Sequence, residues 1–407
     1  MSSTSTDPDV GAELHRPGTP GFRRLNTAML LAGLAAFGLL YAAQPVLPQL
    51  GREYDVAPGT ASLAVSATTG ALALSVLPAA ALARRWSRVR VMRVGLVVSV
   101  LLTAAVAVSP DFTTLVVLRA LSGLALAAVV GVAMGHVGAE VHPAGLGSAM
   151  GLYVAGNSLG GVGGRLVTAS VSDLAGWRWG MAALALAGLV VTVAFWRLLP
   201  DAVAPDPGRP DAASPTSRGL WLRPALLALL LVPFTLMGGF VAVYNYLGYR
   251  LSGSPFDLPP AALGLVFLAY LAGTVASALA GRAVDRVGRP PVLVASVLVM
   301  LGGLLLTLPD QLLLVVLGLV VLTAGFFGAH ATASGWAPVV AAPYGTRGSA
   351  SYVGAYYAGS SVFGLAVGGA WTAYGWGGVV LWVGLLAVVG LLAGLVVTVA
   401  TRRPAGR

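Results

Sequence analysis

The stretch GNSLGGVGGR, residues 156–165, has five glycines in ten positions and ends in an arginine. Its flanks, GLYVA before and LVTAS after, are apolar enough to lie in a membrane. Gly156, Gly160 and Gly164 recur every four residues, so on a helix they form one stripe. Small residues in such a stripe let a second membrane helix approach closely. We therefore expect these three glycines to be helix-packing positions.

A second stripe runs one position over and contains Tyr153, Asn157, Gly161 and Arg165. This stripe is polar, with a gap at Gly161. A charged side chain near the bilayer centre costs about 3 kcal/mol on insertion scales, so it must face protein or a water-filled cavity. The spacing predicts a face directed at a substrate pathway. The alternative is that Arg165 only caps backbone carbonyls near the outer surface.

The composition indicates that lipid is the main solvent of this chain. Of the 407 residues, 57% are hydrophobic and 9% are charged, whereas soluble domains carry about 25% charged residues. All 24 basic residues are arginine, and cysteine is absent. The lack of cysteine excludes disulfides and cysteine metal sites. The lack of lysine excludes a phosphate-binding loop of the G-x-x-x-x-G-K-[ST] type.

Twelve stretches reach the length of about 20 apolar residues that a membrane-spanning helix needs. They are 25–47, 61–83, 91–109, 113–135, 147–170, 178–199, 223–247, 260–281, 291–308, 312–340, 348–372 and 377–400. Residues 197–219, rich in Pro, Asp and Ser, interrupt the series after the sixth stretch. The sequence therefore predicts an all-α membrane protein with 12 transmembrane helices in two six-helix halves. The expected parts are a disordered N-terminus (1–24), an N-terminal bundle (25–199), a linker (200–222), a C-terminal bundle (223–400) and a tail (401–407).

The arginines predict the orientation of these helices. If the N-terminus is cytoplasmic, nineteen arginines fall in cytoplasmic segments, and the outer loops hold only Arg52, Arg178 and Arg250. The remaining two, Arg119 and Arg165, lie inside predicted spans. Positive charge accumulates on the cytoplasmic side of membrane proteins. Both termini are therefore expected in the cytoplasm, with the chain in a bacterial-type cytoplasmic (inner) membrane. Because the arginines sit in short clusters between apolar segments, the net charge of +10 does not indicate a nucleic-acid partner.

The two halves repeat each other in sequence. Residues 151–158, GLYVAGNS, align with 354–361, GAYYAGSS, at an offset of 203. At that offset Phe37 falls on Phe240, and Tyr41 falls on Tyr244. A six-plus-six repeat with a central linker is typical of transporters whose halves rock about a site near the membrane midplane.

Three motifs resemble the major facilitator superfamily over nearly the whole chain. GRAVDRVGRPPVL (281–293) resembles the cytoplasmic loop signature of that family, and LRALSG (118–123) resembles its fourth-span motif. GNSLGGVGGR resembles the glycine-rich fifth-span motif of the family's exporters, although Gly161 stands where that family often has proline. YAAQPVLPQL (41–50) adds a likeness to the arabinose-efflux-like and YnfM-like bacterial exporters.

This resemblance implies a gate in the loop after the eighth span, where an aspartate pairs across the halves and latches one conformation. The positions carried over are Gly281, Asp285, Arg286, Gly288 and Arg289. The alternative is that the arginines only hold the orientation of the chain.

The first-half counterpart of this loop is ALARRWSRVRV (81–91). It has Arg84 in place of the aspartate and Ser87 in place of the second glycine. We therefore expect the intact latch in the second half.

Proton-coupled exporters usually need a titratable group inside the membrane, yet none of the 14 acidic residues lies in a predicted span. Asp111, eight residues before Arg119, would reach it only if the fourth span starts earlier than predicted. The candidates for proton coupling are therefore His330 and Arg119. His136 is less well placed. Histidine has an unperturbed pKa near 6.5, which makes it switchable. The segment HVGAEVH (136–142) has too few ligands to predict a metal site.

Polar side chains also mark the predicted substrate pathway in the first, seventh and eleventh spans. They are Tyr41, Gln44, Tyr244, Asn245 and Tyr356, and Arg119 in the fourth span is expected on the same pathway. The alternative is that they only form the hydrogen bonds common between membrane helices, which contribute about 0.6 kcal/mol each.

The resulting interpretation is a secondary transporter working by alternating access. It is expected to export small organic molecules, either drug-like compounds or sugars, in exchange for protons, as a monomer without a cofactor. An uptake permease or uniporter is the alternative with the same fold. A membrane-embedded enzyme or sensor is disfavoured, because the spans lack paired carboxylates and any Ser-His-Asp set.

Overall fold

The computed structural model describes residues 14–201, 224–340 and 346–402, which are mostly helical. The first group of elements is α1 (Pro20–Leu40), η1 (Gln44–Val46), α2 (Leu47–Glu53), α3 (Pro58–Ala61), α4 (Leu63–Trp86), α5 (Arg88–Ala107), α6 (Phe112–Val130), α7 (Ala133–Glu140), α8 (Pro143–Ala175) and α9 (Trp177–Leu198). The second is α11 (Pro224–Leu251), α12 (Pro260–Val266), η2 (Phe267–Ala269), α13 (Tyr270–Val287), α14 (Arg289–Leu306), α15 (Leu312–Val340) and α16 (Thr346–Arg402). In the described residues, 10 helical stretches are long and apolar enough to cross a membrane. The predicted all-α membrane class is confirmed.

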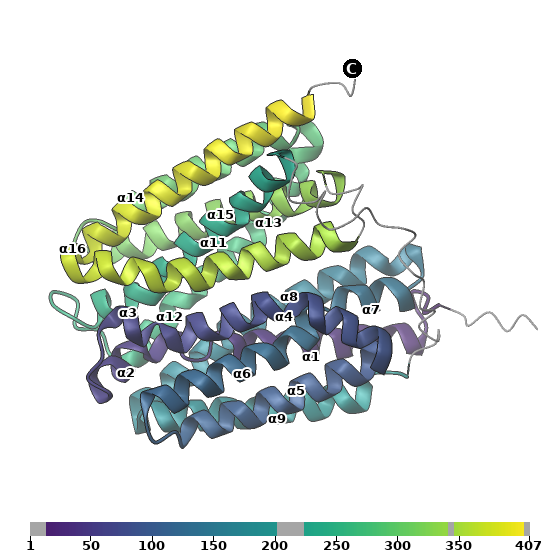
Figure 1. The fold of residues 1–407 in the computed structure, drawn as a ribbon, viewed down its shortest axis with the longest axis horizontal. Helices are drawn as coiled ribbons and strands as arrows, with labels where there is room; N and C mark the ends of the chain where they lie inside the picture. Colours follow the sequence, from purple (N-terminus) through teal and green to yellow (C-terminus); the bar gives the residue numbers. More distant parts are fainter. Residues whose placement is uncertain (1–13, 202–223, 341–345, 403–407) are drawn as a thin grey trace, which may run out of the picture.

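The helices before residue 201 lie on one side of the molecule and those after residue 224 lie on the other (Figure 1). Helix α1 begins and α16 ends at the same end, on the right in Figure 1, which we call the terminal end. The opposite end, which carries α2 and α3, is called the loop end.

The glycine stripe of α8 lies directly against α1. A Cβ atom at Gly156 or Gly160 would overlap a backbone carbonyl of α1, and one at Gly164 would overlap the backbone of Gly38. Gly359, at the offset of 203 from Gly156, meets the backbone of Phe234 in the same way. The sequence repeat therefore corresponds to the same close helix contact, between α1 and α8 and between α11 and α16.

The turns at Ser87 and Gly288 join consecutive helices at equivalent places. Ser87 has φ 75° and Gly288 has φ 83°. Glycine adopts positive φ freely, whereas a residue with a Cβ does so at a cost. The missing glycine of the first-half loop therefore leaves the backbone path unchanged and adds local strain at Ser87.

The first helix differs from its predicted bounds of 25–47. It begins at Pro20, because the Thr19 hydroxyl accepts a hydrogen bond from the Phe22 N–H at 3.2 Å and caps the helix. The expected disorder is thus wrong for residues 20–24, while residues 1–13 lie outside the described part. The helix ends at Leu40, just before Pro45 and Pro48, since prolines interrupt a helix.

Other predicted spans also differ in their bounds. The eighth, 260–281, is divided into α12, η2 and α13 and continues to Val287, so Asp285 lies in a last helical turn. The eleventh and twelfth are continuous except at Gly375, whose φ of 58° breaks the helix. Helix α7 extends to Glu140, beyond the predicted end of the fourth span. The linker at 202–223 lies outside the described residues.

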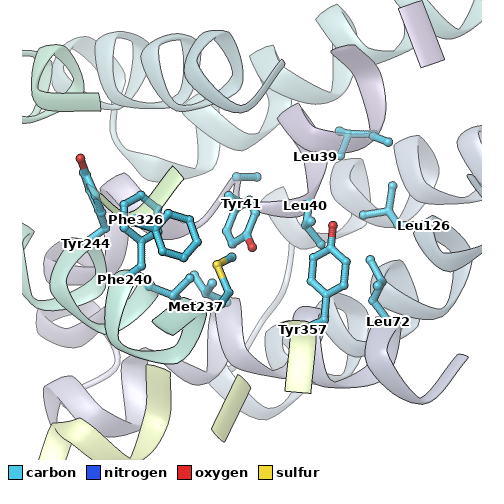
Figure 2. Packing of buried hydrophobic residues seen from close by; sticks show 14 of the residues in the cluster. Leu39, Leu40, Tyr41, Leu72, Leu126, Met237, Phe240, Tyr244, Phe326 and Tyr357 are labelled. Carbon is cyan, nitrogen blue, oxygen red and sulfur yellow. The ribbon is translucent and has the colours of Figure 1, made fainter. Parts of the chain in front are cut away.

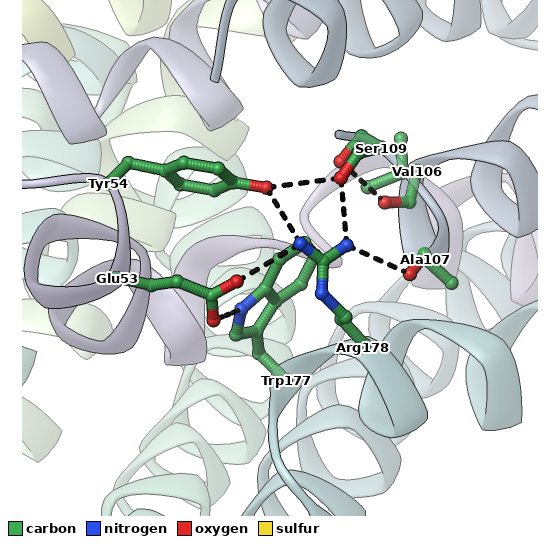
Figure 3. Close-up of polar contacts among 7 residues, drawn as sticks. All are labelled: Glu53, Tyr54, Val106, Ala107, Ser109, Trp177 and Arg178. Atoms are coloured by element: carbon green, nitrogen blue, oxygen red, sulfur yellow. Dashed lines mark hydrogen bonds and ion pairs between the residues drawn. The ribbon is translucent and has the colours of Figure 1, made fainter. Parts of the chain in front are cut away.

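A polar cluster ties three segments together at the loop end (Figure 3). Arg178 donates to the Glu53 carboxylate at 3.0 Å and to the Ser109 carbonyl at 2.8 Å. The Trp177 indole N–H donates to the same carboxylate, and its ring lies 4.5 Å from the Arg178 guanidinium carbon. This cluster holds the end of α2 and the start of α9 against the α5–α6 turn.

The second half has a comparable cluster, in which the arginine lies at the end of α11 and the carboxylate in the turn between α14 and α15. Arg250, at the end of α11, donates to the Asp310 carboxylate at 3.1 Å and to the Leu308 carbonyl at 3.0 Å. Trp376 lies 5.0 Å from its guanidinium carbon and donates to the Thr307 carbonyl at 3.1 Å. Both clusters neutralise helix ends at the loop end, since a cation there satisfies free carbonyls.

Candidate functional site

Arg165 lies on α8 and is buried. Its side chain is 1% exposed. The Nε atom donates to the Gln44 amide oxygen at 2.7 Å, and Nη1 donates to the Gly161 carbonyl at 2.6 Å. The Nη2 atom is 3.4 Å from the Tyr270 hydroxyl. All three partners are neutral.

Three aromatic rings surround the same guanidinium. Its central carbon lies 4.6 Å from the Tyr41 ring centre, 5.0 Å from Phe267 and 4.7 Å from Tyr270. At these distances, within about 6 Å, the ring faces stabilise the cation. Tyr41 comes from the break after α1, whereas the other two come from the second half of the chain. Tyr41 lies between the leucines of α1 and the phenylalanines of the second half in Figure 2.

Gln44 and Asn245, which are 201 residues apart, meet where the two halves join. The Gln44 amide nitrogen donates to the Asn245 amide oxygen at 2.8 Å. Asn245 in turn reaches the Gly364 carbonyl at 3.4 Å. A continuous chain of hydrogen bonds therefore runs from Arg165 on α8 through Gln44 to α11 and α16. The Tyr249 hydroxyl, 2.8 Å from the Leu47 carbonyl, adds a second link between the halves at the loop end.

Arg119 is fully buried and binds backbone carbonyls instead of an acid. It donates to the carbonyls of Ala64 at 2.9 Å, Leu39 at 2.9 Å and Leu40 at 2.5 Å. Two of these acceptors end α1, where the helix has unsatisfied carbonyls and a partial negative charge. These contacts make Arg119 a cap that stabilises the break in α1. That break positions Tyr41 and Gln44.

Asp111 does not reach Arg119. Its carboxylate caps α6 and accepts hydrogen bonds from the Thr114 backbone N–H at 2.8 Å and from the Thr114 hydroxyl at 2.7 Å. These bonds, chiefly the backbone one, lower the pKa of the Asp111 carboxyl below its usual value. In the described part of the chain, neither Arg119 nor Arg165 has a carboxylate partner.

An aromatic cluster continues from Arg165 toward the terminal end. Its members, from α11, η2, α13, α15 and α16, are Phe240, Tyr244, Phe267, Tyr270, Phe326, Phe327, His330, Tyr352, Tyr356 and Tyr357. The Tyr352 hydroxyl is 3.2 Å from His330 Nδ1, and the Tyr356 ring lies 4.7 Å from the imidazole. His330 and Tyr356 are partly exposed. We name this set the aromatic wall.

The remaining predicted pathway residues differ in burial and in the groups that they contact. Tyr244 is buried and shares a 2.8 Å hydrogen bond with Thr323. Tyr153 is buried, whereas Asn157 is half-buried and approaches the backbone of Gly33. Sequence reasoning missed Phe267 and Tyr270, although an aromatic pair three residues apart inside a predicted span was visible.

The predicted gate residues are at the terminal end, from Gly281 in the C-terminal part of α13 to Arg289, the first residue of α14. Asp285 and Arg286 are exposed, whereas Gly288 and Arg289 are half-buried. A Cβ at Gly281 would have open space around it. Asp285 makes no ion pair within the described residues.

A cavity of about 430 Å³ opens between α4, α11 and α16. Nine of its ten lining residues are apolar or glycine, and Ser351 is the exception. Leu77 and Leu227, at its edge, are 51% and 42% exposed. The cavity therefore offers an apolar surface between the two halves.

Comparisons with known proteins agree with this architecture. The profile of the Major Facilitator Superfamily matches residues 29–255. The chain is 37% identical to the uncharacterized MFS-type transporter YybF of Bacillus subtilis, over 92% of this chain and 94% of the relative. It is 39% identical to the inner membrane transport protein YnfM of Escherichia coli, over 93% of this chain and 91% of the relative.

Solved structures show the same fold at low sequence identity. The nucleoside transporter NupG superposes with a TM-score of 0.74 at 13% identity, covering 92% of this chain and 99% of that one. A bacterial homolog of the human lysosomal transporter Spinster, in an inward-facing and occupied conformation, gives 0.73 at 14% identity, covering 94% and 97%. The expected resemblance is thereby confirmed: this chain belongs to the major facilitator superfamily and is a multi-pass membrane transporter, not an enzyme.

Proposed function

We propose that the protein is a monomeric secondary transporter that exports small organic molecules, drug-like compounds or sugars, in exchange for protons. Twelve spans follow if α8 is added to the ten apolar stretches and α16 is counted as two spans separated at Gly375. The two halves, 25–199 and 223–400, then rock about a midplane site. Both termini lie in the cytoplasm, so the terminal end is the cytoplasmic end.

The hydrogen-bond chain from Arg165 through Gln44 to Asn245 is the observation that carries this proposal. It joins the two halves near the loop end with buried polar groups. Near the terminal end, Asp285 is exposed and Gly281 has open space around its Cα. A molecule closed near one end and unlatched at the other is one of the two states that alternating access requires. The substrate would therefore enter from the cytoplasmic end in this conformation.

His330 is the residue to which we assign proton coupling. It lies in the aromatic wall, partly exposed and beside the Tyr352 hydroxyl. It carries the one imidazole of the aromatic wall, and an imidazole is a side chain that can take up and release a proton. Arg119 is a poor proton carrier, because a guanidinium stays protonated in proteins and its three acceptors are backbone carbonyls.

Spin-label distances are expected to reveal two conformations without any knowledge of the substrate. The chain has no cysteine, so paired cysteines report without background. One pair replaces Arg52 and Pro259 at the loop end, and the other replaces Arg85 and Arg282 at the terminal end; all four residues are exposed. In nanodiscs, each pair should give a short and a long distance. Double electron–electron resonance measures them.

The two pairs should change in opposite directions. In each conformation, a short distance for the loop-end pair should accompany a long distance for the terminal-end pair, and the reverse. Their ratio should change between pH 8 and pH 5.5, and His330→Gln should remove this change. A single loop-end distance at every pH would contradict alternating access. A ratio that is independent of pH in the unmodified chain would contradict proton coupling.

The latch in the second half predicts an asymmetry between two substitutions. Asp285→Asn should reduce transport at least tenfold, because the state closed at the terminal end loses its charged partner. Arg84→Ala, at the equivalent place in the first half, should reduce it less than threefold. Drug resistance of cells expressing each variant at equal level measures the difference. Equal effects of the two substitutions would contradict a latch confined to the second half.

A further inference from the structure

The two buried arginines differ in how their charge is compensated. Arg119 binds three carbonyls, two of them at the C-terminal end of α1, where the helix carries a partial negative charge. Arg165 binds only one carbonyl, Gly161, which lies inside the continuous helix α8. Its other polar partners are an amide and a phenol. Of the two, Arg165 therefore keeps a positive charge that no helix end and no described carboxylate offsets.

The guanidinium also has hydrogen-bond donors to spare. Arginine carries five N–H donors. The contacts of Arg165 use one on Nε, one on Nη1 and one on Nη2, the last at 3.4 Å. Two donors therefore have no acceptor among the described residues. The buried Tyr41 hydroxyl, on the ring that faces the same guanidinium, likewise has no partner there.

The surroundings of these free donors are apolar and flat. Phe267, Tyr270 and Tyr41 present ring faces to the guanidinium, and the aromatic wall extends from Tyr270 to the partly exposed His330 and Tyr356. A Cβ at Gly161 would lie 3.2 Å from Nη1. A side chain at position 161 would therefore crowd the guanidinium, and glycine avoids this contact.

We propose that the substrate is an organic anion, whose carboxylate or similar oxyanion binds the free donors of Arg165 and the Tyr41 hydroxyl. The remainder of the molecule packs on the aromatic wall. This inference rests on the proposed transport function and narrows its substrate class. A buried charge with unused donors is best complemented by an ionised acceptor, which forms short charge-assisted hydrogen bonds. A cationic substrate would be repelled by the same charge.

The position of Arg165 also links binding of the anion to the hydrogen bonds that hold the loop end closed. Arg165 donates to Gln44, and Gln44 donates to Asn245 across the halves. An anion bound to the free Nη donors would draw the guanidinium toward itself and so lengthen the hydrogen bond from Nε to the Gln44 amide oxygen. Binding of the anion would thus weaken the chain that holds the loop end closed, as an exporter loaded from the cytoplasmic end requires.

Binding of three probes of one shape and different charge tests the proposal. They are benzoate, benzamide and benzamidine, which are negative, neutral and positive at pH 7. The full chain, purified in detergent, is titrated with each, and its thermal unfolding midpoint is followed. Benzoate should raise the midpoint with a Kd at least tenfold lower than that of benzamide. Benzamidine should not raise it.

Three variants distinguish loss of the proposed contacts with the anion from effects of removing any arginine or of lowering stability. Arg165→Gln should weaken benzoate binding at least tenfold and leave benzamide unchanged. Tyr41→Phe, which removes only a hydroxyl, should weaken benzoate binding a few-fold. Arg52→Gln, which removes an exposed arginine at the loop end, should bind benzoate like the unmodified chain. If Arg165→Gln does not fold, Tyr41→Phe still decides the matter.

The proposal is overturned if benzamide binds as tightly as benzoate, if none of the three probes binds, or if neither variant changes benzoate binding. These failures are distinguishable from failure of the proposed function. Opposed spin-label populations without benzoate binding would reject only the anionic substrate. A fixed loop-end distance would reject the transport cycle itself.

Discussion

Gly160→Leu should remove nearly all folded protein from the membrane. A Cβ at Gly160 overlaps the carbonyl oxygen of Leu34 on α1. A leucine there would push α1 and α8 apart along their whole contact, because packed helices cannot relax around a backbone clash. We expect at least a tenfold lower yield of monodisperse protein, measured by size-exclusion chromatography of a fluorescent fusion.

Gly163→Leu is the matched control on the same helix. A Cβ at Gly163 has no atom within 4 Å. Both substitutions relieve the same glycine penalty of about 1 kcal/mol in helix propensity, so any difference between them reports the contact with α1. A yield of Gly160→Leu close to that of the control would show that the stripe is not a packing surface.

Arg165→Ala is expected to preserve folding and abolish transport. The substitution removes a buried charge that has no acidic partner in the described chain, so it leaves no uncompensated carboxylate behind. Gln44 keeps its hydrogen bond to Asn245. Expression should stay within twofold of the unmodified chain, whereas resistance to exported compounds should fall at least tenfold. Membrane yield and growth inhibition are measured on the same cultures.

Arg119→Ala provides the contrast to this variant. It removes the three guanidinium hydrogen bonds to the buried carbonyls of Ala64, Leu39 and Leu40. Each lost hydrogen bond to a charged group costs about 1.5–3 kcal/mol, so this variant should lose folded protein as well as transport. If Arg165→Ala were fully active, Arg165 would have only a structural role as a cap of backbone carbonyls. A well-folded Arg119→Ala would contradict the role of Arg119 in holding the break of α1.

Much of the architecture could be predicted from the sequence, because it depends on local patterns. Apolar stretches of membrane length, the linker at 197–219 and the repeat at an offset of 203 lead to the fold class. Helix bounds were less predictable: Thr19 and Pro20 start α1 early, and Gly375 breaks α16 by its backbone conformation alone. These are effects of single residues that average hydropathy does not record.

The candidate site was only partly predictable. Tyr41, Gln44, Arg165 and Asn245 were expected to lie on a pathway, but no pattern paired Gln44 with Asn245 or Arg165 with Tyr270. For Arg119, sequence spacing could point only to a side-chain partner, Asp111. Its actual acceptors are backbone carbonyls, two of them at the end of a broken helix, and the sequence cannot indicate these because every residue type carries the same carbonyl.

By itself, the sequence determined that this chain is a helical membrane protein with two similar halves and that one face of residues 156–164 is a packing stripe. Periodicity of four residues suffices for that conclusion, since helix geometry is local. The tertiary structure alone decided which of two buried arginines is a helix cap and which keeps free donors among aromatic rings. Apart from Gly161, four residues before Arg165, their partners are 55 to 121 residues away in sequence. Only folding brings such groups within hydrogen-bond distance.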